Sequence, residues 1–278
     1  MTVVKVILIV ILIMALLYFY AIMPRKRRPE VFSRNTRYYA HRGLFDNSGP
    51  FPENSAGAFK KAVNAGYGIE LDVQMSKDGV PVVIHDFTLE RPVGKPGRVA
   101  DYTFDELKSF SLFGSDERIP SFREVLEIVG GRVPLIIELK VERTDLSVCD
   151  AVWELLKDYR GEYCVESFNP LPLRWFRRCH PEVARGQLSD NFMSDPQFRG
   201  KHTPFMWAMQ MMMANFLSRP DFIAYNHLFM GNLSRRLCRH LFGAYGAAWT
   251  IKSDADFNRA KDEFDVFIFD SYIPTISA

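Results

Sequence analysis

Four polar residues in the first third of the sequence carry side chains suited to acid–base or metal chemistry. His41, Glu70, Asp72 and His85 each lie at or near the end of a short apolar run. Such runs have the length and composition of brief buried strands, so these side chains fall where strands stop. Imidazole exchanges a proton near neutral pH, and carboxylates bind cations. The pattern therefore predicts a catalytic or metal-binding site at the rim of a sheet or barrel.

The carboxylates are spaced to share one face of the sheet. Residues two apart in a strand point to the same side, so Glu70 and Asp72 project together, and Glu138 can join them from a later strand. Three carboxylates repel one another unless a cation lies between them, and ligands that are all oxygen suit Mg²⁺, Ca²⁺ or Mn²⁺. The alternative is a structural ion network in which these acids pair with Arg42 or Lys140.

Six short motifs follow one another in a fixed order. They are HRG at 41–43, PENS at 52–55, ELD at 70–72, DGVPVVIHD at 78–86, IELK at 137–140 and WT at 249–250. In this order they resemble the glycerophosphodiester phosphodiesterase family, in a membrane-anchored bacterial form, over roughly residue 38 to the C-terminus. Two positions depart from the family pattern: Ile251 follows the WT motif where asparagine is usual, and Phe269 precedes Asp270 where threonine is common. We expect these departures to affect substrate choice rather than the reaction.

The resemblance implies a metal-dependent phosphodiesterase that hydrolyses glycerophosphodiesters to glycerol 3-phosphate and an alcohol. It implies one divalent cation held by Glu70, Asp72 and Glu138. It also implies that His41 and His85 are the acid/base pair. The sequence does not assign which histidine is the acid, and the nucleophile is either water or a neighbouring hydroxyl of the glycerol.

Three further residues are candidates for holding the substrate. The planar fork of an arginine and the point charge of a lysine both suit a phosphoryl group, so Arg42 and Lys140 are candidate phosphate ligands. Trp249 ends a predicted strand, where it either lines the substrate pocket or packs as a core aromatic residue.

Two other functions stay open at this point. One is phospholipase D-like hydrolysis of a lysophospholipid or phospholipid at a membrane. The methionine-rich stretch 205–213 would favour it if that stretch formed an apolar lip, together with Phe192, Met193 and Phe198 before it, rather than a core helix. The other is a barrel that binds lipid headgroups without catalysis. The presence of both His41 and His85 argues against it, because binding alone needs no proton transfer.

Predicted strands and helices alternate along the chain, which is typical of a parallel α/β architecture. We expect eight strands at 38–40, 69–73, 135–139, 163–167, 183–188, 222–225, 244–249 and 266–269, and helices at 54–65, 121–129, 145–159, 172–179, 204–217, 232–241 and 253–263. This predicts a TIM-type (β/α)8 barrel. Residues 82–84 follow the second strand too closely for a helical crossover, so they should form an antiparallel hairpin at the mouth. Residues 94–105 are expected to be a loop.

The N-terminus carries a separate signal. Val6–Met23 is an uninterrupted apolar run, long enough to cross a bilayer, and Arg25–Arg28 follows it at once. No small-residue cleavage site is evident, so we expect a retained single-pass anchor at 1–28, a linker at 29–37 and the barrel at 38–278. The positive-inside rule places the barrel in the cytoplasm. The alternative is a helix buried against the domain.

Composition excludes some other classes of protein. About 240 residues remain after the N-terminal segment, which suits one barrel. The net charge of +2 is too small to indicate nucleic-acid binding. The four cysteines show no CxxC spacing, so we expect reduced buried thiols rather than a thiolate metal site. The oligomeric state is not indicated.

Overall fold

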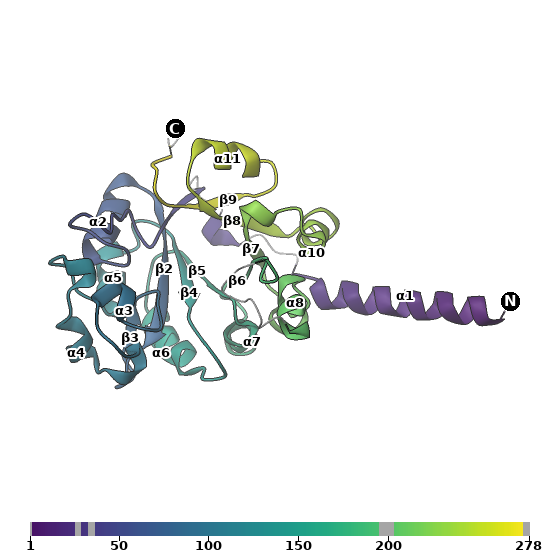
Figure 1. The fold of residues 1–278 in the computed structure, drawn as a ribbon, viewed down its shortest axis with the longest axis horizontal. Coiled ribbons are helices and arrows are strands. Elements are labelled where there is room, and N and C mark those ends of the chain that lie inside the picture. Colours follow the sequence, from purple (N-terminus) through teal and green to yellow (C-terminus); the bar gives the residue numbers. More distant parts are fainter. Residues whose placement is uncertain (1, 26–28, 33–36, 195–202, 275–278) are drawn as a thin grey trace.

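A closed ring of parallel strands is the frame that positions the candidate site (Figure 1). The computed structural model describes residues 2–25, 29–32, 37–194 and 203–274. In those residues the strand order is β1-β9-β8-β7-β6-β5-β4-β2-β3, and β1 also pairs with β2, so the ring closes. The predicted barrel is confirmed. Its parallel strands are β1 (Tyr38–His41), β2 (Gly68–Met75), β4 (Leu135–Leu139), β5 (Tyr163–Ser167), β6 (Arg185–Ser189), β7 (Phe222–Asn226), β8 (Tyr245–Ile251) and β9 (Val266–Phe269).

The predicted hairpin is also present. Strand β3 (Pro81–Val83) pairs antiparallel with the end of β2, with Val73 opposite Val83. Gly79 closes the turn at φ +81°, a left-handed conformation that favours glycine. The amide of Ile84 then donates to the carbonyl of Asp72 at 3.0 Å, which brings the chain back to the mouth just before His85.

Helices cover the outside of the ring, and polar caps begin several of them. Side chains of Ser55, Ser121, Asn169 and Thr203 each accept a backbone N–H in the first turn of the helix that follows. The covering helices are α2 (Ala56–Ala65), α5 (Phe122–Val129), α6 (Ser147–Leu156), α7 (Pro170–Cys179), α8 (Pro204–Gln210), α9 (Asn215–Ser218), α10 (Leu233–Arg236), the π-helical turn η6 (Leu237–Leu241) and α11 (Asp254–Ala260).

Two segments differ from the sequence-based expectation. The helix expected at 204–217 is broken into α8 and α9, with Met212 between them at φ +52°, a conformation that no helix continues through. Of the loop expected at 94–105, residues 94–103 connect α3 (Glu90–Val93) to α4 (Phe104–Lys108) and contain the turn η2 (Val99–Asp101). Residues 104–105 are the first two residues of α4. Thr103 and Glu106 form a capping box that starts α4.

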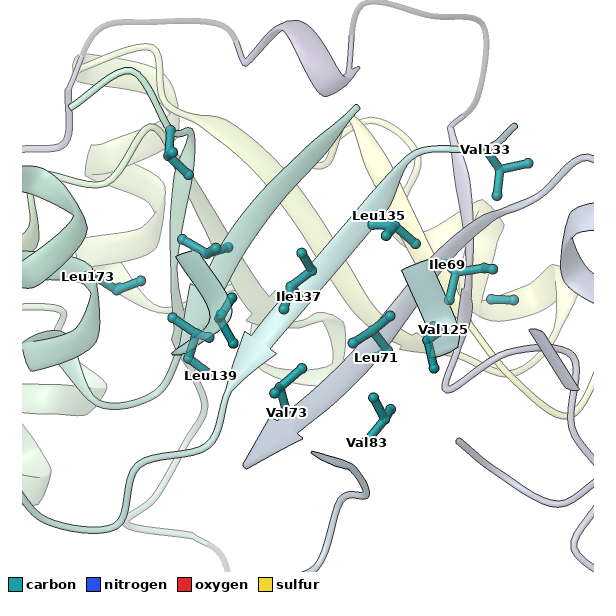
Figure 2. Packing of buried hydrophobic residues seen from close by; sticks show 14 of the residues in the cluster. Ile69, Leu71, Val73, Val83, Val125, Val133, Leu135, Ile137, Leu139 and Leu173 are labelled. Atoms are coloured by element: carbon teal, nitrogen blue, oxygen red, sulfur yellow. The ribbon is translucent and has the colours of Figure 1, made fainter. Parts of the chain in front are cut away.

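Alternation along the strands separates an apolar layer from the site. Figure 2 shows Leu71 and Val73 of β2 beside Ile137 and Leu139 of β4, in the layer between the strands and the helices. Because strand side chains alternate, the residues between them point to the other side of the sheet, into the barrel. The hydrophobic layer therefore forces Glu70, Asp72 and Glu138 inward, which confirms the expected shared face.

The N-terminal helix α1 (Thr2–Ile22) projects from the side of the barrel (Figure 1). It is the one helix of the described residues that is long and apolar enough to cross a membrane. Within the segment 29–37, Val31 and Phe32 are buried. The centre of the Phe32 ring lies 5.0 Å from the centre of the Phe222 ring. The basic residues 26–28 and Phe198 lie outside the described residues.

Candidate active site

Three buried carboxylates form the centre of the site. Asp72 of β2 stands directly opposite Glu138 of β4, and Glu70 lies two residues earlier on β2. One oxygen from each of the three lies within 4.8 Å of the others, and each residue is at least nine-tenths buried. Burial and the neighbouring carboxylates raise the pKa of Glu70 well above its ordinary value. The three oxygens are close enough to share one divalent cation, which would relieve this repulsion.

The donor set fits a hard divalent cation. All three groups offer oxygen only, and no thiolate or imidazole belongs to the cluster. Lys140 lies 3.0 Å from Glu138 Oε1 and 3.5 Å from Asp72 Oδ1, so its ammonium group supplies part of the compensating charge. Asp72 Oδ1 is buried and accepts no hydrogen bond from the described residues, which leaves it available to a metal ion. The contacts of Lys140 with these carboxylates are therefore compatible with a metal ion at the same cluster.

Arg42 lies against this cluster. Its Nε is 3.4 Å from Asp72 Oδ2, and its Nη1 donates to Glu53 Oε1 at 2.8 Å. Asn54 donates to the same Asp72 oxygen at 2.9 Å. Burial alone would raise the pKa of Glu53, but hydrogen bonds from Arg91 and the charge of Arg42 outweigh it and lower the pKa to about 2. Glu53, from the PENS motif at 52–55, therefore holds the Arg42 guanidinium in place.

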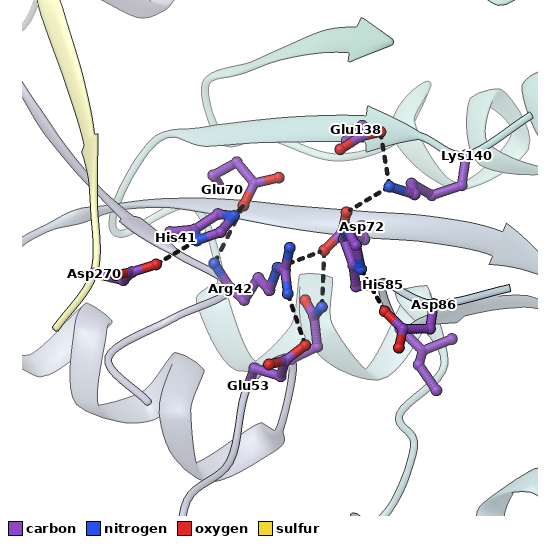
Figure 3. Close-up of polar contacts among 12 residues, drawn as sticks. His41, Arg42, Glu53, Glu70, Asp72, His85, Asp86, Glu138, Lys140 and Asp270 are labelled. Carbon is purple, nitrogen blue, oxygen red and sulfur yellow. Dashed lines mark hydrogen bonds and ion pairs between the residues drawn. The ribbon is translucent and has the colours of Figure 1, made fainter. Parts of the chain in front are cut away.

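His41 is oriented by an acid from the last strand. Its Nδ1 lies 2.9 Å from Asp270 Oδ2, and its Nε2 lies 3.9 Å from Glu70 Oε2 (Figure 3). Burial and the charge of Arg42 lower the pKa of His41, and the hydrogen bond with Asp270 partly offsets them. Because Asp270 occupies Nδ1, the Nε2 atom is the one directed toward the carboxylates.

His85 has an equivalent arrangement on the hairpin side. Its Nδ1 lies 2.6 Å from Asp86 Oδ1, and Arg91 donates to both oxygens of that carboxylate. Arg91 also donates to both oxygens of Glu53, at 2.9 and 2.7 Å. The Arg91 guanidinium on α3 therefore links Asp86, which lies beside His85, to Glu53, which lies beside Arg42. The sequence predictions did not include Arg91, since a single arginine outside the recognised motifs carries no spacing signal.

An aromatic wall stands at the other side of the mouth. Trp249, at the end of β8, packs edge-on against Phe168 at 5.7 Å, and Phe168 packs against Phe192 at 6.0 Å. The Nε1 donor of Trp249 is buried and has no hydrogen-bond partner among the described residues. Trp249 is thus a partly buried aromatic residue with an unused donor, which suits a residue that lines a substrate pocket.

Glu166 is a further buried acid that sequence reasoning missed. It lies on β5 opposite Glu138, is 1% exposed, and its Oε2 has no hydrogen-bond partner in the described part of the chain. Burial and the charges of Glu138 and Asp72 raise its pKa well above the ordinary value. The alternation along β5 that faces Glu166 inward could have indicated it.

Comparison with known proteins identifies the family. A sequence model of the glycerophosphoryl diester phosphodiesterase family matches residues 41–270, which contain every residue of the site described above. The chain belongs to that family. It is accordingly an enzyme, a phosphoric diester hydrolase, as the motifs predicted.

Individual relatives of this phosphodiesterase agree. The glycerophosphodiester phosphodiesterase of Caldanaerobacter subterraneus subsp. tengcongensis is 37% identical over 175 residues, which are 58% of this chain and 70% of that protein. The enzyme of the same name from Bacillus altitudinis is 34% identical over 181 residues, 61% of this chain and 73% of its own.

A solved structure shows the same fold. An Oleispira antarctica phosphodiesterase, in complex with the product sn-glycerol-3-phosphate, superposes with a TM-score of 0.69 at 25% identity, covering 87% of this chain and 95% of that one. The glycerophosphodiester phosphodiesterase of Thermotoga maritima gives 0.64 at 26% identity, covering 84% and 94%.

Proposed function

We propose that this phosphodiesterase hydrolyses glycerophosphodiesters to glycerol 3-phosphate and an alcohol, with His41 and His85 exchanging the protons. The observation that carries the proposal is the pair of imidazoles near the acidic cluster, each with its Nδ1 held by an aspartate. This leaves Nε2 of each ring free to meet the substrate. The Oleispira antarctica enzyme, which has glycerol 3-phosphate as its product, supports the assignment of the product.

Each histidine transfers one proton in the proposed reaction. One neutral imidazole accepts a proton from the attacking water or glycerol hydroxyl as its oxygen bonds to phosphorus. The other, as imidazolium, gives its proton to the leaving alkoxide as the second P–O bond breaks. The aspartates on Nδ1 stabilise whichever ring is charged, so each ring can be reset after turnover. Attack by water gives glycerol 3-phosphate directly, whereas attack by the glycerol hydroxyl gives a cyclic phosphate, which water then opens with the two imidazoles in exchanged roles.

Glu70, Asp72 and Glu138 would hold one divalent cation, of which Mg²⁺, Ca²⁺ and Mn²⁺ fit the oxygen donors. When bound, it supplies charge neutralisation and polarisation of the phosphoryl oxygens. Arg42 and Lys140 provide fixed positive charge at the same place, and Trp249 provides an apolar wall with one donor. We assign these three residues to holding the substrate.

We further propose that α1 anchors the enzyme in a membrane as a single-pass helix, with the barrel (38–278) after an anchor (1–28) and a linker (29–37). The apolar run and the basic residues that follow it support the span, and the positive-inside rule supports a cytoplasmic barrel. We favour a soluble glycerophosphodiester as the substrate, because the assigned site residues are suited to binding the phosphate and none of them is assigned to a lipid chain.

A substrate panel tests the function. The full chain in detergent would be supplied with glycerophosphocholine, glycerophosphoethanolamine, glycerophosphoglycerol or a lysophospholipid, with each divalent ion added separately after chelation. We expect metal-dependent release of glycerol 3-phosphate from at least one of the first three. Turnover of the lysophospholipid alone would establish the lipid alternative, and absence of turnover of all four with every ion would refute hydrolysis.

A further inference from the structure

The C-terminal end of α1 is built into the barrel. Ile22 is completely buried, and its carbonyl accepts hydrogen bonds from Asn215 Nδ2 at 2.8 Å and from the Cys238 thiol at 3.3 Å. Tyr18 and Ser234 share a hydrogen bond of 2.7 Å between their hydroxyls. Asn215 and Ser234 are themselves fully buried. The barrel therefore supplies partners for the helix end, and the loss of α1 would leave these buried polar groups unpaired.

Arg219 completes this connection. Its Nη1 donates to the carbonyls of Tyr20 and Met23 at 3.1 and 2.9 Å, and its guanidinium lies 4.3 Å from the centre of the Tyr20 ring. The next residues continue the contact, because the amide of Arg25 donates to the carbonyl of Pro220 at 2.8 Å. Free carbonyls at a helix end are thus satisfied by the barrel, which sets the direction in which α1 leaves it.

Large apolar side chains are exposed on the elements that surround this junction. Figure 1 shows α8 and α10 on either side of the place where α1 leaves the barrel. The side chain of Asn232, which caps α10, donates to the carbonyl of Gln210 at the end of α8, so these elements are in contact. The exposed residues, which we call the junction face, are Phe205, Trp207, Phe216, Leu228, Leu233 and Leu241.

The length of α1 indicates that membrane lipid covers the junction face. Residues 3–17 are the part of α1 that stands clear of the barrel, since Tyr18 and Phe19 pack on its core. Fifteen residues at 1.5 Å each span about 22 Å, whereas the hydrocarbon layer is about 30 Å thick. The remaining ~8 Å matches the depth of about 5–10 Å to which interfacial apolar faces enter a bilayer. With α1 across the bilayer, as proposed above, the barrel around the junction would lie within the interface.

We propose that the junction face is seated at the boundary between the headgroups and the acyl chains of a phospholipid bilayer and holds the barrel against the membrane. The proposal rests on the proposed membrane span of α1. Tyr20 and Trp207 are aromatic residues of the kind enriched at this depth, and Arg25 and Arg219, the latter over the Tyr20 ring, suit the lipid phosphates.

The seating also places one side of the active-site mouth at the lipid surface. Strand β6 ends at the mouth, where Ser189 donates to the carbonyl of Met209 at 3.1 Å, and the amide of Met193 donates to Gln210 at 2.9 Å. Helix α8, which carries part of the junction face, is therefore tied to the rim of the site. Diesters released at the membrane surface would reach the site from this side.

Spin labelling of the full chain in vesicles tests the seating. Cys179 is the exposed thiol, while Cys149, Cys164 and Cys238 are buried, so Cys179→Ser would be the background. Single labels would be placed by Leu233→Cys and Leu241→Cys on the junction face. Glu127→Cys on α5, across the barrel from α1, is the exposed control. Collision of each nitroxide with apolar O₂ and with a water-soluble nickel chelate would be measured in phosphatidylcholine and phosphatidylglycerol vesicles.

We expect the labels at 233 and 241 to collide at least about fivefold more with O₂, relative to the nickel chelate, than the label at 127, as interfacial seating requires. Equal ratios at all three positions would show that the barrel stands clear of the lipid and would overturn the proposal. Protection of 233 and 241 from both reagents would show a protein partner on the face and would overturn it equally. Diester hydrolysis by each labelled chain in detergent shows that the labelled chain is folded. If the unlabelled enzyme hydrolyses no diester, the proposed function is refuted, but the seating proposal is not.

Discussion

Replacing Asp270 by asparagine is the sharpest test of how His41 works. The carboxylate accepts the Nδ1 proton of His41, and Asp270→Asn keeps the shape of the side chain but removes the charge. An amide can also turn its NH₂ group toward Nδ1 and stabilise the tautomer that carries the proton on Nε2. We therefore expect a neutral imidazole in the wrong tautomer and a less stable imidazolium.

The size of the effect follows from Asp270 itself. Burial alone would raise the pKa of Asp270, but the hydrogen bond and charge of His41, with smaller contributions from Ser271 and Lys252, lower it from 3.8 to about 2. A shift of this size corresponds to about 2 kcal/mol of interaction with the carboxylate, most of it with His41. Loss of that stabilisation in the transition state lowers kcat/KM by about 30-fold.

The assay is the pH dependence of kcat/KM on glycerophosphocholine. The carboxylate favours the imidazolium, so its removal lowers the pKa of His41 and moves one limb of the profile to lower pH. Movement of the acidic limb would identify His41 as the base, and movement of the basic limb would identify it as the acid. Asp265→Asn is the matched control, because Asp265 precedes the same strand and pairs with Arg239 away from the site. Activity within twofold of wild type and an unmoved profile would refute the reasoning.

Three other outcomes are expected. His85→Ala should lower turnover by about two to four orders of magnitude with the fold intact, whereas His240→Ala, a surface control beside Glu263, should not; near-normal turnover in His85→Ala would exclude it as an acid or base. Chelation should abolish activity, Mg²⁺, Mn²⁺ or Ca²⁺ should restore it, and Glu138→Gln should prevent the recovery; full activity after exhaustive chelation would contradict the metal site. The folded-state pKa of Glu53 is about 2, below its ordinary 4.5, so its ionised form stabilises the fold above about pH 4.5 and that stability is lost as pH falls toward 2. Thermal unfolding between pH 2 and 6 should therefore depend less on pH in Glu53→Gln than in the wild type. The same pH dependence in both proteins would exclude the contacts of Glu53 with Arg91 and Arg42 as its cause.

The sequence alone determined the architecture and the chemical centre. Strand and helix periods are local, so the alternating pattern predicted the ring of parallel strands and the hairpin after β2. The two-residue period of a strand also put Glu70 and Asp72 on one face, and the alternation of β4 put Glu138 beside them. The face on which each side chain lies follows from these local periods, whereas the meeting of Glu138 with Glu70 and Asp72 depends on the pairing of β2 with β4.

Only the tertiary structure decided what orients these groups. Asp270 reaches His41 across 229 positions because β1 pairs with β9 when the ring closes, and no local pattern specifies that pairing. Arg91 connects two acids because the fold brings α3 against both Glu53 and Asp86, and no spacing in the sequence indicates that contact. Asn215 meets Ile22 across 193 positions because the end of α1 is buried against α9. Side-chain periodicity indicates which way a residue faces within its own element. The partner that it contacts depends instead on the loops that bring distant elements together, and the packing of the whole chain determines how those loops close.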